Sequence, residues 1–408
     1  MYEILKKRNQ GLRDDVVKFA QQLIQQPSPS LNEGPLSSLV YKKMVDLGYD
    51  QVYRDEFGNI IGLMLGREAG PTLLLNSHMD TMPTGDIKQW QKSPFSGDTA
   101  DNKLYGCGAS DCKAGLAAQI FAGALLKRSL LPLKGNLVVA ASVGQECGGN
   151  IGICGLIEKT LPQMELSPSY AVLGEPTELA IYYGHDGWIE LEIKVEGQNR
   201  LNTKKAAKAI VCEFNSSQQY QSINDTDNFI VQKTNLESNN SSGPITIGLN
   251  QRINYLEDVD AVVRRLKHDA ALVTRIMDDV AVDVTICQEV QKTYTGKATI
   301  VKKITHAWSI DPFNPLIDSA RHSLFAAGSD VQTGKWQLGK VGMGTAGGLL
   351  LKNYGIPAIG YGPGNEATAH GPNEYVETEK IIEAVYGTAV MAQSMIGIPV
   401  FGWTSAEV

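Results

Sequence analysis

The 408-residue sequence is poor in cysteine and histidine and has no excess of positive charge. Its six cysteines have no repeating spacing, which argues against a disulfide framework and favours reduced thiols. The net charge of -7 excludes the basic footprint expected of a protein that binds nucleic acid. With 43% hydrophobic and 20% charged residues, the composition also argues against disorder or a coiled coil over the whole chain.

Long hydrophobic runs are also missing from the sequence. The first fifteen residues, MYEILKKRNQGLRDD, contain no apolar stretch long enough for a signal peptide. No segment approaches the roughly 20 apolar residues that a membrane-spanning helix needs. We therefore expect a cytoplasmic protein without a membrane partner.

Two styles of hydrophobic pattern divide the chain. In residues 1–183, and again in 305–408, short apolar runs alternate with helical segments, which is typical of an α/β domain. Between them, Trp188–Glu196 alternates strictly between apolar and charged residues, which predicts a strand with one face in water. We therefore expect one α/β domain that is interrupted by a smaller α+β domain at residues 184–304.

Several acids and histidines follow the apolar runs or lie in glycine-rich loops, where α/β proteins place ligand sites. His78 ends one such run and is followed by Asp80, which could orient the imidazole. The others are Asp111, Glu146, Glu175 and His370. Taken singly, each is better explained as a structural or exposed residue. Taken together, five such ligands suit a pair of Zn²⁺ or similar ions that share one carboxylate.

The motifs around these residues resemble the M20 family of metallopeptidases and deacylases. That family includes acetylornithine deacetylase, succinyl-diaminopimelate desuccinylase and glutamate carboxypeptidase. The matching segments are Ser77–Thr81, Tyr105–Gly115, Glu146–Gly149, Gly174–Thr177 and Ala369–Glu374. The resemblance covers nearly all of the α/β part and only the placement of the insert. It implies a three-layer, zinc-exopeptidase-like α/β metallopeptidase domain whose insert is a lid that forms a homodimer.

The resemblance also implies roles for single residues. Five of them would hold two metal ions: His78 and Glu175 one, Glu146 and His370 the other, and Asp111 both. Asp80 would belong to the catalytic set by orienting His78. The implied cofactors are two divalent ions, with Zn²⁺ preferred over Co²⁺ or Mn²⁺.

A glycine-rich segment matches the loop that contacts the substrate carboxylate in the family. Its residues are Gly344, Thr345, Ala346 and Gly347. Backbone N–H groups at a helix start are suited to a carboxylate. A packed glycine turn explains the same residues equally well.

Two positions depart from the family pattern. Where the family has a glutamate that acts as general base, this sequence has Gln145. An amide can orient water but cannot accept its proton, and general-base catalysis contributes roughly 10²–10⁴-fold. The segment Gly197–Lys205 also lacks the histidine that, in the family, reaches the neighbouring subunit's site and stabilises the oxyanion.

Other polar residues near the motifs have simpler explanations. Cys107, Cys112 and Cys147 adjoin expected ligands, but the family has non-ligands at these positions, so buried packing is favoured. His185 precedes Asp186, which stands where the family has an arginine. It could supply a substitute polar group, although a structural or surface role is the simpler explanation.

Three functions remain open on the sequence. The first is a two-metal hydrolase of an N-acyl-amino acid or peptide-like amide bond, with metal-activated water as nucleophile. The second is a metal-binding enzyme with non-hydrolytic or substrate-assisted chemistry. The third is a ligand-binding pseudoenzyme, because Gln145 replaces the base. An engineered substitution at Gln145 would explain that residue but not the insert.

Overall fold

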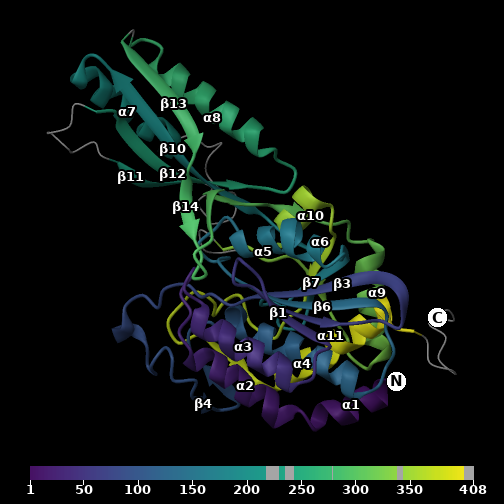
Figure 1. The fold of residues 1–408 in the computed structure, drawn as a ribbon. Coiled ribbons are helices and arrows are strands. Elements are labelled where there is room, and N and C mark those ends of the chain that lie inside the picture. The colour runs from purple at the N-terminus through teal and green to yellow at the C-terminus, as the bar shows by residue number, and fades with distance from the viewer. Residues whose placement is uncertain (217–228, 235–242, 278, 338–342, 399–408) are drawn as a thin grey trace.

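The larger part of the chain is built on one mixed β-sheet (Figure 1), seen in a computed structural model that describes residues 1–216, 229–234, 243–277, 279–337 and 343–398. Within these residues the strand order is β1-β2-β6-β3-β7-β19-β8-β18. The four central strands run parallel: β6 (Lys134–Ser142), β3 (Glu68–His78), β7 (Pro168–Leu173) and β19 (Ala358–Gly360). Because parallel strands end at one edge of a sheet, the loops that follow them meet at that edge.

The flanking strands complete the sheet with mixed pairing. They are β1 (Gln51–Arg54), β2 (Ile60–Met64), β8 (Ile181–Tyr182) and β18 (Thr333–Gly334). A separate small sheet joins β4 (Thr99–Ala100), β5 (Lys103–Tyr105) and β20 (Tyr375–Glu377). Since β20 follows the loop of His370 and β5 precedes the loop of Asp111, this pairing brings two distant loops together.

Helices cover both faces of the main sheet, so the α/β part has the three layers expected (Figure 1). On one side lie α2 (Arg13–Gln25), α3 (Gly34–Asp46) and α4 (Ala114–Arg128). On the other lie α5 (Ile151–Gly155), α6 (Leu161–Gln163) and α10 (Gly347–Tyr354). The remaining helices of this part are α1 (Tyr2–Gln10), α9 (Pro315–Ala326) and α11 (Thr378–Ile396). Short helical turns occur at Ile87–Gln89, Ala109–Lys113 and Leu156–Thr160.

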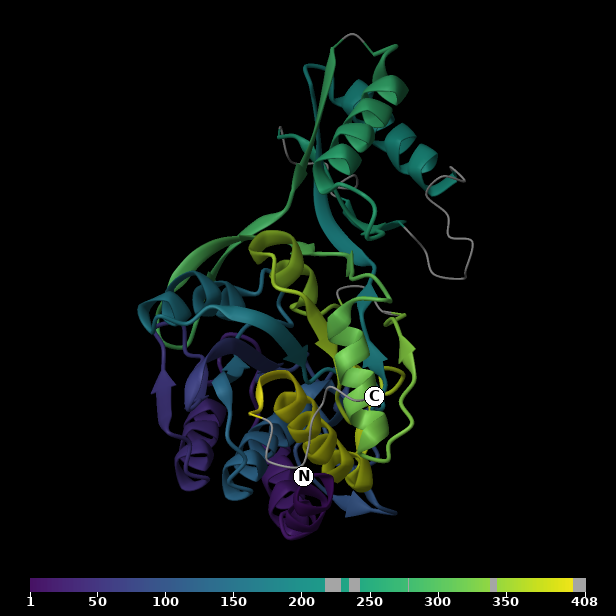
Figure 2. The ribbon, with the colours of Figure 1, turned by 90° about the vertical axis from the view of Figure 1, so that its right-hand side faces the viewer.

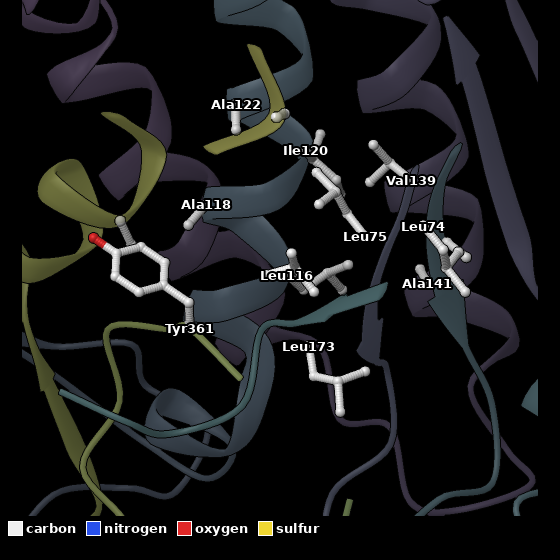
Figure 3. Packing of buried hydrophobic residues seen from close by; sticks show 14 of the residues in the cluster. Leu74, Leu75, Leu116, Ala118, Ile120, Ala122, Val139, Ala141, Leu173 and Tyr361 are labelled. Carbon is white, nitrogen blue, oxygen red and sulfur yellow. The ribbon is translucent and has the colours of Figure 1, made fainter. Parts of the chain in front are cut away.

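Helix α4 is the centre of the main core. Every residue from Ala114 to Leu126 is buried, because small alanine side chains let α4 pack closely against both the sheet and α11. Figure 3 shows α4 side chains such as Leu116 and Ile120 beside Leu75 of β3. At the start of α4 the backbone comes so close to β7 that a Cβ on Gly115 would collide with the carbonyl oxygen of Gly174. This approach brings the Asp111 loop next to Glu175.

A second sheet forms the core of the expected insert. Its path is β11-β12-β10-β13, with β16 also beside β10. These strands are β10 (Gly187–Gly197), β11 (Phe229–Thr234), β12 (Ile245–Ile253), β13 (Val280–Ile286) and β16 (Ile304–Thr305). Helices α7 (Arg200–Ser216) and α8 (Val259–Thr274) lie on one side of this sheet (Figure 2). The apolar residues of β10 enter a hydrophobic cluster of their own, and the predicted alternation along this strand is confirmed.

One part of the insert returns to the α/β part. The hairpin of β14 (Gln288–Lys292) and β15 (Ala298–Lys302) carries Tyr294, whose hydroxyl group lies 2.8 Å from both Ser37 Oγ and the Gly58 carbonyl oxygen. At the two junctions, β9 (Gly184–His185) pairs with β17 (Trp308–Ser309). The division into residues 1–183 with 305–408 and 184–304 stays a prediction, and the hairpin is its least independent segment.

Among the described residues, no helix combines the length and the apolar character that a bilayer crossing requires.

Candidate metal centre

All five expected metal ligands lie together at the carboxyl edge of the parallel strands. His78 is the last residue of β3, while Glu146 and Glu175 follow β6 and β7. Asp111 lies in the turn before α4, and His370 lies in the loop after β19. The side chains of the five residues are at most 9% exposed. Four separate loops are thus needed to assemble this buried cluster.

Asp111 belongs to two groups of potential metal ligands. His78, Asp111 and Glu175 form one group, together with the thiol of Cys112, and their ligand atoms lie within 4.8 Å of one another. Asp111, Glu146 and His370 form the other group within the same limit. Asp111 Oδ1 lies 3.1 Å from His78 Nε2, and Asp111 Oδ2 lies 3.1 Å from His370 Nε2. The two oxygens of one carboxylate therefore face two different imidazoles.

The buried carboxylates of the cluster favour positively charged groups beside them. Burial opposes protonation of His370, but Glu146 and Asp111 outweigh it and raise its pKa to about 11. Burial raises the pKa of Glu175 to about 7. His370 Nε2 is buried and makes no well-aligned hydrogen bond with any described residue, although Glu146 Oε2 is only 3.0 Å away. Three carboxylates and two imidazoles, which become neutral when they bind a metal, converge in a way that suits two divalent cations.

Asp80 fixes both His78 and the segment that carries Glu146. His78 Nδ1 lies 2.9 Å from the Asp80 carbonyl oxygen and 3.5 Å from Asp80 Oδ1, which turns Nε2 toward Asp111. The Asp80 carboxylate accepts hydrogen bonds from Ser30 Oγ, at 2.7 Å, and from the backbone N–H of Glu146, at 2.8 Å. Burial opposes its ionisation, yet these contacts and His78 hold its pKa below the ordinary value. Asp80 thus contacts two members of the cluster, His78 and Glu146, and helps to fix their positions.

Gln145 lies beside the ligand cluster and is bonded to one of its members. Its Nε2 donates to Glu175 Oε1 at 2.7 Å and, over a longer distance of 3.4 Å, to the carbonyl oxygen of Gly344. Its backbone N–H donates to Asp80 Oδ1 at 3.1 Å. The side-chain amide therefore acts as a donor toward Glu175.

The expected substrate loop is only partly at the cluster. Gly344 contacts Gln145, but Gly347 begins α10 and packs so closely on Trp308 that a Cβ there would collide with the indole ring. Thr345 is buried, and Ala346 is buried directly before α10. The glycine-rich stretch continues before these residues to Gly342, which lies outside the described residues.

His185 contacts the glycine-rich segment through Thr345. The backbone N–H of Thr345 donates to His185 Nε2 at 3.0 Å, and His185 Nδ1 lies 2.5 Å from the Asp186 carbonyl oxygen. Burial lowers the pKa of His185 to about 4, so the imidazole is neutral. Since both ring nitrogens are engaged, this geometry favours the structural role for His185. Asp186 is itself paired with Arg252, at 3.1 Å.

Glu374 is a residue whose importance the sequence analysis missed. Its carboxylate accepts hydrogen bonds from three backbone N–H groups, those of Gly108 at 2.9 Å, Ser110 at 2.7 Å and Asp111 at 2.9 Å. It thereby joins the His370 loop to the Asp111 turn. The available signal was an acid four residues after His370 in a loop rich in glycine and proline.

Cys112 is the one member of the two groups that the sequence analysis assigned to packing. Burial raises the pKa of this thiol to about 12, so it stays protonated at neutral pH. Its Sγ lies 3.6 Å from the carbonyl oxygen of His78. Both observations agree with a packing role for a protonated thiol.

Two cavities border the cluster, and Met82 lines both. One has a volume of about 220 Å³ and is lined by Asp111, His370, Glu374 and Trp90, among others. The other has a volume of about 240 Å³ and lies between Glu146 and the strands β10 and β12. In the second cavity, residues of the insert therefore face a member of the cluster.

Residues of the insert also hold the segment that follows Glu146. Lys303 Nζ donates to the carbonyl oxygen of Cys147 at 2.6 Å, and Gln291 Nε2 donates to that of Gly148 at 2.9 Å. The position of Glu146 is thus tied to the insert as well as to the sheet.

Comparison with known proteins agrees with this arrangement. The pattern of "Peptidase family M20/M25/M40" matches residues 74–394. The uncharacterized protein YgeY of Escherichia coli (strain K12) is 24% identical over 392 residues, covering 91% of this chain and 92% of YgeY.

The fold is also similar to solved structures at low sequence identity. Human carnosine dipeptidase 1 has a TM-score of 0.70 at 14% identity, covering 97% of this chain and 98% of that one. The Bacillus subtilis YXEP protein, described as a dinuclear metal binding peptidase from the M20 family, has a TM-score of 0.68 at 14% identity over 94% and 98% of the two chains. With the family pattern matching most of the α/β part, the chain belongs to peptidase family M20/M25/M40.

Proposed function

We propose that this protein is a two-metal hydrolase that cuts an amide bond in a small N-acyl-amino acid or a short peptide. The observation that carries the proposal is the sharing of Asp111 between two groups of buried ligand atoms. The names of two structural neighbours, a human dipeptidase and a dinuclear metal binding peptidase, support the same reaction class.

The proposed ligand sets follow the two groups. His78 and Glu175 would hold one ion, Glu146 and His370 the other, and Asp111 both. Bound divalent ions supply a Lewis acid for the scissile carbonyl group and lower the pKa of water. Zn²⁺ fits the nitrogen and oxygen ligands, and Co²⁺ or Mn²⁺ are the alternatives.

The remaining residues would orient and position. Asp80 keeps His78 Nε2 directed at the cluster, and Glu374 holds the turn of Asp111. Gln145 can donate a hydrogen bond from its amide and accept one at its oxygen, but it cannot take up a proton. We therefore propose a hydrolase whose proton transfer is slow, or one in which a group of the substrate accepts the proton.

The contact of Gln145 with Glu175 favours one alternative function. With Nε2 committed to the carboxylate at 2.7 Å, this amide stabilises a metal ligand instead of acting on a substrate. A protein that binds an acyl-amino acid or peptide through its metal ions, without cutting it, would need Gln145 only to hold Glu175 in place. A cytoplasmic location and a homodimer through the insert stay predictions under either function.

Metal content and hydrolysis together test the proposal. We expect about two ions for each chain after reconstitution with Zn²⁺, as measured by mass spectrometry of the digested protein. Asp111→Ala should lose both ions, whereas Glu175→Ala should lose one. The purified protein should then hydrolyse at least one member of a panel of acyl-amino acids and dipeptides, and only with metal. Failure to bind metal would overturn both functions, while tight metal binding without any turnover would favour the binding protein.

A further inference from the structure

The second cavity beside the cluster has a polar lining that the proposed reaction does not use. It has a volume of about 240 Å³ and lies against Glu146. On the side of the insert it is lined by Trp188, Glu190 and Asn250. Lys303 and the adjoining residues of β16 form another part of its wall. A group bound here would be close to a proposed metal ligand.

Asn250 is a buried amide without a partner. It is 1% exposed, and neither Nδ2 nor Oδ1 has a hydrogen-bond partner among the described residues. It lies opposite Glu190 in the pairing of β10 with β12, while the preceding residue, Leu249, enters the hydrophobic cluster of the insert. Because successive strand residues point to opposite faces, Asn250 faces the cavity and away from that cluster.

Trp188 adds a second unpartnered group to the same cavity. The residue is 4% exposed, and its Nε1 has no hydrogen-bond partner within the part of the chain that the structure describes. Burial of such donors and acceptors without partners costs free energy, which a ligand with matching groups would recover. Two side chains that line the same cavity thus each lack a partner among the described residues.

The charges around the cavity select the kind of group that fits. A carboxylate would accept hydrogen bonds from Asn250 and Trp188, but it would lie near Glu146 and Glu190 and leave Asn250 Oδ1 unpaired. An ammonium group would face the Trp188 N–H and Lys303. The ammonium of Lys303 is already bonded to Glu289 at 2.5 Å and to the Cys147 carbonyl oxygen. A neutral group with both a donor and an acceptor matches all of these neighbours.

We propose that this cavity is a subsite for a carboxamide-type group of the substrate, bound by Asn250 through paired hydrogen bonds and by the Trp188 N–H. A primary amide, a ureido group and a second peptide bond each carry an N–H donor next to a carbonyl acceptor. The inference rests on the proposed function, because it assigns the cavity to the molecule whose amide bond reaches the metal centre.

Two matched sets of ligands test the subsite. One varies the side chain of the amino acid and the other varies the acyl group, so that the carboxamide lies on either side of the scissile bond. One set is N-acetyl-glutamine, N-acetyl-glutamate and N-acetyl-norleucine. The other is succinamoyl-glycine, succinyl-glycine and pentanoyl-glycine. Binding to the Zn²⁺-loaded protein is measured by calorimetry, or by kcat/KM for a ligand that is cut. In at least one set the carboxamide should bind about 5- to 100-fold more tightly than both relatives.

Variants identify the residues responsible. Asn250→Leu and Trp188→Phe should each reduce or remove the preference for the carboxamide. Gln251→Leu, a change in the neighbouring buried amide that does not line the cavity, should leave the preference intact. Asn250→Leu should leave the melting temperature unchanged or raise it, because the amide it removes has no partner within the described chain. A residue needed only for folding would lower it.

The outcomes separate the subsite from the proposed function. Tighter binding of the carboxamide without any hydrolysis would support the subsite and overturn the hydrolase. Hydrolysis with equal or greater preference for the carboxylate or the alkyl member in both sets would overturn the subsite and leave the hydrolase standing. A preference that survives in Asn250→Leu, or no measurable binding of any member, would also overturn the subsite.

Discussion

Replacing Gln145 by glutamate changes the contact nearest to the proposed chemistry. In the native protein Gln145 Nε2 donates to Glu175 Oε1 at 2.7 Å. Gln145→Glu replaces that donor by an acceptor, so two carboxylates would meet at about the same distance. At an effective dielectric constant of about 20, two unit charges at this separation repel by about 6 kcal/mol. The variant without metal must therefore keep a proton between the two groups or move them apart.

Bound metal ions should offset the repulsion between the two carboxylates. The new carboxylate could then act as the general base. A general base contributes roughly 10²–10⁴-fold to the rate, which corresponds to a barrier lower by about 3–5 kcal/mol. We expect kcat/KM of Gln145→Glu to rise by this factor for the best substrate of the native protein. We also expect the metal-free variant to unfold more easily than the native protein, and the Zn²⁺-loaded variant to recover most of the difference.

The assay compares Gln145→Glu with Gln145→Ala at equal metal content. Alanine removes the amide without supplying a base, so it controls for loss of the contact with Glu175. Each variant is measured by initial rates on acyl-amino acids and dipeptides, with the metal content of each sample determined in parallel. If Gln145→Glu holds two ions and is no faster than Gln145→Ala, the assignment of residue 145 to the base position is wrong.

Three other perturbations test the supports of the site. Glu374→Ala leaves three backbone N–H groups without their acceptor, so chemical denaturation should show a loss of at least about 3 kcal/mol, and metal affinity should fall roughly 10–100-fold. The pKa of about 4 for His185 in the folded state lies below the unfolded value near 6.5, so its stabilising effect is complete at neutral pH and is lost as the pH falls through that interval. Between pH 8 and pH 5 the native protein should therefore lose about 2 kcal/mol more than His185→Gln, whereas equal losses would argue against a neutral buried imidazole. Gly115→Ala places a methyl group against the Gly174 carbonyl oxygen and should cost about 1–3 kcal/mol and weaken metal binding. Gly243→Ala, whose methyl group would meet no atom of the described residues within 4 Å, should do neither.

Much of the fold could be predicted because several segments have strong local patterns. The alanine-rich stretch Ala114–Arg128 is recognisable as a helix from its residues and forms α4, since helix propensity and burial favour the same state there. The alternation at Trp188–Glu196 matches β10, because one face of that strand packs on helices while the other carries glutamates. The hairpin of β14 and β15 was missed as a contact with the α/β part, because its pairing is local but its docking through Tyr294 depends on distant residues.

The candidate site could be predicted as a set of residues but not as a geometry. Strand ends identify His78 and Glu175 as neighbours, because parallel strands finish at one edge. Glu374 could not be recognised in the same way, since a carboxylate that accepts backbone N–H groups looks like any loop acid in a sequence. The contact of Gln145 with Glu175 likewise depends on side-chain placement that no spacing specifies.

The bonds from Lys303 and Gln291 to the segment after Glu146 make the two proposed ion sites unequal. His78 and Glu175 are fixed by the rigid ends of β3 and β7, whereas Glu146 is held partly by side chains of the insert. A rotation of the insert would therefore act first on the segment of Glu146, and would reach Glu175 only through the bond from Gln145. Linkage then requires reciprocity: if one position of the insert strengthens binding of the ion at Glu146, that ion stabilises this position of the insert by the same free energy.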